Sequence, residues 1–129
     1  MRLLATLLLS LIAMNASLAQ SVHTPEAGSP ERKALLDAAR APLEQRLRQP
    51  VVFHVDQLRA VGDWAFLLAH MQGQGGKPLD FAGTPFEQAA QAGYMSRVYA
   101  ALLQREHGHW TIRAEAIGPT DVAWTNWAH

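Results

Sequence analysis

The sequence predicts an α+β domain in which one amphipathic helix packs on a four-stranded antiparallel sheet. An early segment repeats apolar residues every three or four positions, which is the period of one face of a helix. Four later segments are rich in β-branched, aromatic or alternating apolar residues, which is typical of strands. Short turns join these strands in pairs, so consecutive strands should run antiparallel and the helix can cover one face of their sheet.

The first nineteen residues have the three-part layout of a secretory signal peptide. Arg2 supplies the positive charge, and residues 3–13 form an apolar run too short to span a bilayer. Ser17 and Ala19 are the small residues of a cleavage site. We therefore expect cleavage after Ala19 and a periplasmic or secreted protein. Residues 20–28 are polar and predict a disordered leader, and residues 29–129 predict a single α+β domain.

The helix is predicted over about residues 30–48. Ser29 suits the N-cap position and Pro30 the first helical position. The apolar stripe that should face the sheet consists of Leu35, Leu36, Ala39, Leu43 and Leu47. Pro42 lacks an N–H and crowds the preceding turn, so the segment should form either one kinked helix or two short ones.

Two strands should follow as a hairpin. Residues 51–58 place Val51, Phe53 and Val55 on one face, and His54 and Asp56 on the other. This alternation is typical of a half-buried strand. Residues 64–71 are apolar on both faces, which predicts a central strand, and residues 61–63 form the turn between the two.

The second half of the chain predicts a loop, a short helix and a second hairpin. Residues 72–83 are the loop, and Thr84 with Glu87 forms a capping box for a two-turn helix that ends before Gly93. Strands are predicted over residues 94–105 and 110–117, with Gly108 in the turn between them. The last strand should have one wet face with Thr111, Arg113 and Glu115, opposite Trp110, Ile112, Ala114 and Ala116.

Composition excludes several functional classes. The chain has no cysteine, so disulfides, thiolate zinc sites and a cysteine nucleophile are excluded. After removal of Arg2, ten basic residues stand against eleven acidic ones, and no basic run exceeds Arg32–Lys33. Nucleic acids and anionic membranes require a concentrated basic face, so we expect neither as a partner. The glycines of residues 73–76 match no phosphate-binding loop, and we expect no cofactor.

The C-terminal segment, residues 117–127, is the most distinctive candidate site. Gly118 and Pro119 turn the chain out of the last strand. Thr120 or Asp121 could then cap a single helical turn, which would place Trp124 and Trp127 on one side. The two indoles either plug the open end of the sheet or form a binding lip with Asp121 as a polar contact.

A second candidate site is the pair His54 and Asp56, which point to the same face of one strand. The pair could act as a general base and its orienting carboxylate, with His70 as a third member. The simpler interpretation is the solvated face of an edge strand, which is where aspartates usually lie. The sequence contains no nucleophile elbow that would support a hydrolase.

A metal site is not predicted. His107 and His109 supply two ligands at best in a turn, and His129 would have to be a third. Zinc requires three or four ligands in fixed geometry with supporting partners, so we interpret the two turn histidines as structural.

Several segments carry a resemblance to a known family: VFHVDQLR at residues 52–59, GDWAF at 62–66, ALL at 101–103 and IGPTDVAW at 117–124. Over about residues 32–127 the chain resembles a family of small exported bacterial proteins of unknown function that end in an Ile-Gly-x-Thr-Asp-Val-x-Trp segment. The resemblance implies a periplasmic location and a single domain, and it carries over no catalytic residue. The fold outline is similar to a small cystatin-like or NTF2-like cone.

The leading functional hypothesis is an exported, non-enzymatic module that binds a small apolar ligand, a peptide or a protein through its sheet face and tryptophan-bearing tail. The alternative is a small cone-type enzyme that uses Asp56 with His54 as general base in an apolar pocket lined by Trp64 or Phe66. The third hypothesis is a homodimer formed through the exposed face of the sheet.

Overall fold

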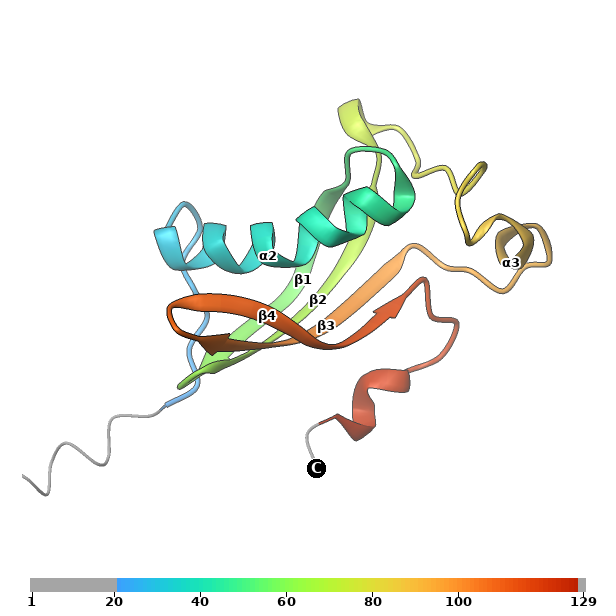
Figure 1. The fold of residues 1–129 in the computed structure, drawn as a ribbon. Helices are drawn as coiled ribbons and strands as arrows, with labels where there is room; N and C mark the ends of the chain where they lie inside the picture. The colour runs from blue at the N-terminus through green and yellow to red at the C-terminus, as the bar shows by residue number, and fades with distance from the viewer. Residues whose placement is uncertain (1–20, 128–129) are drawn as a thin grey trace, which may run out of the picture.

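One long helix packs against one face of a four-stranded antiparallel sheet (Figure 1). The computed structural model describes residues 21–127. The predicted signal peptide, residues 1–19, and His129 lie outside the described residues. The elements in chain order are α2 (Pro30–Leu47), β1 (Val52–Val61), β2 (Trp64–Gln72), η2 (Gln74–Gly76), α3 (Glu87–Gln91), β3 (Val98–Glu106), β4 (His109–Ile117) and η3 (Ala123–Asn126).

The helix α2 begins where the sequence predicts. The Ser29 side chain accepts a hydrogen bond from the Arg32 backbone N–H at 3.1 Å, and Pro30 occupies the first helical position. The helix continues through Pro42 for 18 residues, so the segment is one helix rather than two short ones. Its buried stripe consists of Leu35, Ala39, Leu43 and Leu47. Arg48 ends the helix in the left-handed conformation at φ 54°.

The sheet is a meander with strand order β1-β2-β3-β4. A two-residue turn joins β1 to β2, and its first residue, Gly62, has φ 55°. His107 and Gly108 join β3 to β4 with φ values of 54° and 78°. Positive φ at both central residues is what a tight type I′ hairpin requires. Both predicted hairpins and the central position of β2 are therefore confirmed.

Two bulges change which residues face the helix. In β1 the register shifts between Val55 and Gln57, and Asp56 is the extra residue. In β4 the register shifts opposite Leu102 and Leu103, where Arg113 is the extra residue. An extra residue reverses the alternation beyond it. The predicted faces of the last strand are therefore wrong after Arg113: Glu115 lies on the helix side, and Ala114 and Ala116 lie on the opposite side.

Some predicted boundaries also require correction. The third strand begins at Val98 rather than at residue 94. The short helix begins at Glu87, and the expected capping box does not form. The Thr84 hydroxyl donates to the Phe81 carbonyl and accepts from the Phe86 backbone N–H at 3.1 Å, so it stabilises the turn that precedes the helix.

Residues 21–28 differ from the predicted disordered leader. The backbone of His23 pairs with that of Ala60 at the outer edge of β1, with N–O distances of 2.9 and 2.8 Å. Pro25 is buried, and its carbonyl accepts a hydrogen bond from the Arg32 guanidinium at 3.1 Å. These contacts tie the segment to both the sheet and α2.

The hydrophobic core lies between α2 and the sheet. The helix stripe packs on alternate residues of all four strands, and Leu79 and Phe81 from the long loop are buried with them. The strand residues between these core positions face away from α2. Within residues 21–127, no helix combines the length and apolar character needed to cross a membrane.

Candidate functional site

The sheet face that is turned away from α2, here called the open face, has an apolar centre. The register places cross-strand neighbours side by side on this face. One row across the four strands consists of Arg59, Phe66, Leu102 and Ala114, and the next of Gln57, Leu68, Ala100 and Ala116. A face with this composition would normally be covered.

The C-terminal tail, residues 118–127, folds back beneath this face (Figure 1). Its 3₁₀ helix η3 lies against β4, on the side of the sheet opposite α2. A 3₁₀ helix has three residues per turn, so Trp124 and Trp127 stand one above the other. Both indoles are partly buried. The N-cap of η3 is Val122, without a side-chain cap, so neither Thr120 nor Asp121 has the predicted capping role.

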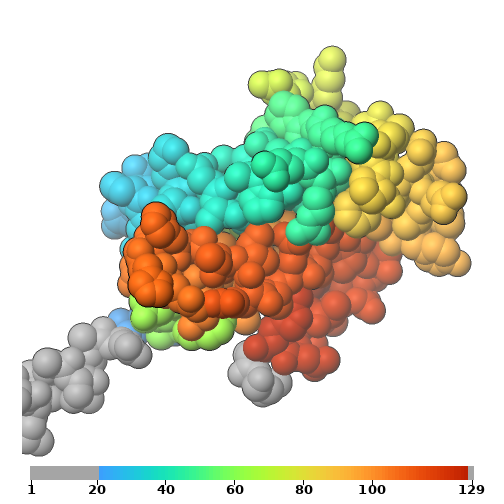
Figure 2. Space-filling model, viewed as in Figure 1, coloured from blue at the N-terminus to red at the C-terminus, as the bar shows by residue number. Residues whose placement is uncertain are grey.

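An open groove lies on the open face, beside the tail. A hollow of about 320 Å³ is lined by Gln57, Arg59, Phe66, Leu102, Trp124, Thr125 and Trp127. A second hollow of about 210 Å³ is lined by Val22, Arg59, Ala60, Val61, Trp64, Ala65, Phe66 and Leu102. The two hollows share Arg59, Phe66 and Leu102, and we call them together the open-face groove. Figure 2 shows the tail below β4, apart from the end of the β1–β2 hairpin.

The polar groups of the groove differ from those expected. Asp121 is exposed and is not among the lining residues, whereas Trp124 and Trp127 are. The polar side chains that line the groove are Gln57 and Arg59 of β1, together with Thr125 of the tail. Sequence reasoning missed this pair because the bulge at Asp56 sets which β1 residues share the face of Phe66. Gln57, Arg59 and Val61 occupy alternate positions, and this alternation is the sequence signal that could have placed them together on one face of β1.

The catalytic candidates lie at the other end of β1 and β2. Asp56 Oδ2 is hydrogen bonded to His70 Nδ1 at 2.6 Å, and His54 Nε2 to Gln72 Oε1 at 2.6 Å. The structure therefore pairs Asp56 with His70 and not with His54. His54, Asp56 and His70 are all exposed. Neither Asp56 nor His54 lines the groove that contains Trp64 and Phe66.

Within the described residues, the turn histidines do not come together with further metal ligands. His107 occupies a central position of the β3–β4 turn, and His109 is the first residue of β4. In the part of the chain from residue 21 to residue 127, no three side chains of the metal-binding types gather at one place.

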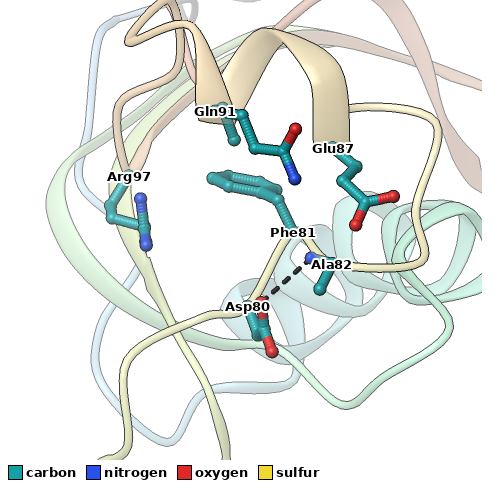
Figure 3. A pocket seen from close by; sticks show the side chains of 7 residues that line it. Asp80, Phe81, Ala82, Glu87, Gln91 and Arg97 are labelled. Carbon is teal, nitrogen blue, oxygen red and sulfur yellow. Dashed lines mark hydrogen bonds between the residues drawn. The ribbon is translucent and has the colours of Figure 1, made fainter.

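A third hollow, of about 230 Å³, lies between α3 and the loop before it (Figure 3). The Arg97 guanidinium stacks over the Phe81 ring at 4.8 Å, and its Nε donates to the Leu79 carbonyl at 3.1 Å. Asp80 accepts a hydrogen bond from the Ala82 backbone N–H at 2.9 Å, as the dashed line shows. Arg97 therefore holds the loop residues Leu79 and Phe81 in place, and Asp80 closes a turn within the loop.

Comparisons with protein-family models, with curated proteins and with solved structures found no match to this chain. The site is therefore interpreted from its own geometry.

Proposed function

We propose that the protein is an exported, non-enzymatic module that binds a small ligand with an apolar body in the open-face groove. The observation that carries this proposal is the position of Trp124 and Trp127. They stand over an apolar sheet face and leave a hollow of about 320 Å³ between the tail and the strands. Ligand sites in proteins have volumes of about 300–1,000 Å³ and mainly apolar walls with a few polar groups.

The partial burial of the indoles supports a binding role beside a structural one. An indole that served only as core would be expected to fill the space beneath it, because protein interiors are closely packed. Trp64 also lines the groove and is 40% exposed. Aromatic side chains with one covered and one accessible face are typical of ligand contacts. The sheet, through Trp64, and the tail, through Trp124 and Trp127, therefore both present partly accessible aromatic side chains to the groove.

Location belongs to the same proposal. Cleavage after Ala19 would place the new N-terminus at Gln20, just before the segment in which His23 pairs with Ala60. Mass spectrometry of protein recovered from the periplasm should find Gln20 as the first residue. Full-length protein in the cytosol would overturn the export proposal. We also propose the resemblance to small exported bacterial proteins. The likeness to a cystatin-like or NTF2-like cone is a further proposal, and it rests on the order of a helix followed by antiparallel strands.

Binding can be tested with Nile red, a neutral dye whose fluorescence rises in apolar sites. We expect Trp124→Ala and Trp127→Ala each to weaken dye binding about tenfold, as for central aromatic contacts in interfaces. Tyr94→Ala is the matched control, because Tyr94 is 72% exposed and lies outside the groove. Urea unfolding of the same variants separates binding from stability. If the tail variants lose stability but bind the dye as the wild type does, the tail is only structural and the proposal fails.

The dimer hypothesis is decided by light scattering. A homodimer through the open face would double the mass and prevent dye binding at high protein concentration. A monomeric mass at all concentrations leaves the groove accessible, as the proposed function requires.

A further inference from the structure

We infer that the ligand of the open-face groove is a small amphipathic carboxylate, whose apolar body lies against the indoles and whose carboxylate pairs with Arg59. This inference rests on the proposed function and names the chemical class of its ligand. It is carried by the position of one guanidinium in an otherwise apolar groove.

Arg59 lies at the centre of the groove. It is one of the three residues that line both hollows, and it stands directly opposite Phe66 in the register of β1 and β2. The pairing of His23 with Ala60 fixes the outer edge of β1 beside it. A ligand that fills either hollow therefore comes within reach of the Arg59 side chain.

The charge of Arg59 has no partner within residues 21–127. Four other arginines are paired with carboxylates: Arg40 with Asp37, Arg46 with Glu115, Arg105 with Asp63, and Arg113 with Glu106. Two more donate to backbone carbonyls: Arg32 to Pro25, and Arg97 to Leu79. Arg59 has neither kind of contact there, and it is the sole charged residue lining the two hollows. Among the described residues, the groove thus offers a cation that has no carboxylate partner.

A guanidinium presents parallel N–H donors that match the two oxygens of a carboxylate. One such group among apolar walls suits a ligand with one negative charge. A doubly charged phosphate would leave its second charge without a cation among the residues that line the groove. The remaining wall, with Trp64, Trp124 and Trp127, suits an aliphatic or aromatic body.

The probes are octanoate and 1-octanol, which share the apolar chain and differ in charge. Binding is followed by titration calorimetry and by the indole N–H signals of the four tryptophans in an NMR spectrum. Octanoate should shift the signals of Trp64, Trp124 and Trp127. Trp110 is an internal control, because it packs under the Arg105 guanidinium outside the groove.

Arg59→Met removes the charge and keeps the apolar stem. We expect it to weaken octanoate binding about tenfold and to leave 1-octanol binding unchanged. Arg48→Met is the matched control: Arg48 is exposed at the end of α2, outside both hollows, and its substitution should change neither affinity. Wild-type octanoate affinity should also fall as salt is raised, because Arg59 is exposed.

The outcomes separate this inference from the proposed function. If wild type and Arg59→Met bind octanoate equally, or if wild type binds 1-octanol but not octanoate, the carboxylate inference is wrong while the groove still binds apolar ligands. If neither probe nor Nile red binds the wild-type protein, the proposed function itself fails.

Discussion

Substituting Tyr99 by phenylalanine tests a buried polar contact between the sheet and α2. The Tyr99 ring is fully buried and stacks on Phe53 with centroids 5.1 Å apart. Its hydroxyl donates to Glu115 Oε2 at 2.6 Å, and the other Glu115 oxygen accepts from the Arg46 guanidinium at 2.6 Å. Tyr99→Phe keeps the ring and its stacking and removes only the hydroxyl. The change in stability therefore reports one hydrogen bond.

A hydrogen bond to a charged group contributes about 1.5–3 kcal/mol to folding. The lower end of this range applies here, because Glu115 keeps its ion pair with Arg46 and is still 11% exposed. The Glu115 carboxylate therefore remains paired in the variant. We expect Tyr99→Phe to lower the free energy of unfolding by about 1.5 kcal/mol. Urea unfolding should show a lower midpoint with an unchanged m-value. Tyr94→Phe is the control and should stay within about 0.5 kcal/mol of wild type.

The same variant has a distinctive dependence on pH. Burial, and then the hydrogen bond to Glu115, raise the pKa of Tyr99 above its ordinary value of about 10. The folded state therefore keeps this proton while the unfolded state loses it as the pH rises above about 10. Wild type should lose up to about 1.4 kcal/mol of stability per pH unit there through this group, and Tyr99→Phe should not.

The gap between the two proteins should therefore be constant below pH 9 and close above pH 10. Equal stability of the two proteins at neutral pH, or a gap that does not change with alkaline pH, would refute the assignment of Tyr99 as a donor to Glu115.

Three further substitutions test the backbone. Pro42→Ala restores a helical N–H inside α2 and should raise the free energy of unfolding by up to about 3 kcal/mol in thermal or urea unfolding. No gain would mean that Pro42 does not destabilise α2. Gly118→Ala should cost about 2 kcal/mol or more, since φ is +63° and a Cβ would meet the Ser96 backbone carbonyl oxygen at 2.9 Å. Gly28→Ala has a similar φ but open space around the Cβ, and it should cost clearly less. Ser29→Ala should cost about 1 kcal/mol by removing the N-cap of α2, whereas an unchanged melting temperature would contradict that role.

The parts of the fold that the sequence predicts well are those set by neighbouring residues. The start of α2 depends on Ser29 and Pro30, and its buried face on a stripe within one helix. The β3–β4 turn depends on Gly108, which can adopt positive φ at little cost. Each of these signals lies within a few residues of the structure that it specifies, so local chemistry is sufficient.

The parts that the sequence does not predict depend on distant contacts. Leu79 and Phe81 lie in a glycine-rich loop whose sequence predicts exposure, yet both are buried because α2 and the sheet leave space for them. The leader is fixed by the pairing of His23 with Ala60, across more than thirty residues. The tryptophans indicate the tail as a candidate site, but its position beneath the open face depends on the contact of η3 with β4.

The bulge at Arg113 links the stability of the domain to its candidate site. Without the extra residue, strict alternation would direct Glu115 to the open face and Ala116 toward α2. With the extra residue, Glu115 reaches Tyr99 and Arg46 on the helix side. The same shift places the small residues Ala114 and Ala116 on the open face, where η3 approaches β4.

A carboxylate on the open face would compete with the proposed carboxylate ligand for the Arg59 guanidinium. Because the bulge removes Glu115 from the open face, the groove keeps one cation and no neighbouring carboxylate among its lining residues. The bulge at Arg113 therefore has two consequences. It places the Glu115 carboxylate under α2 with its partners, and it leaves the surface beneath the tail apolar with a single positive charge.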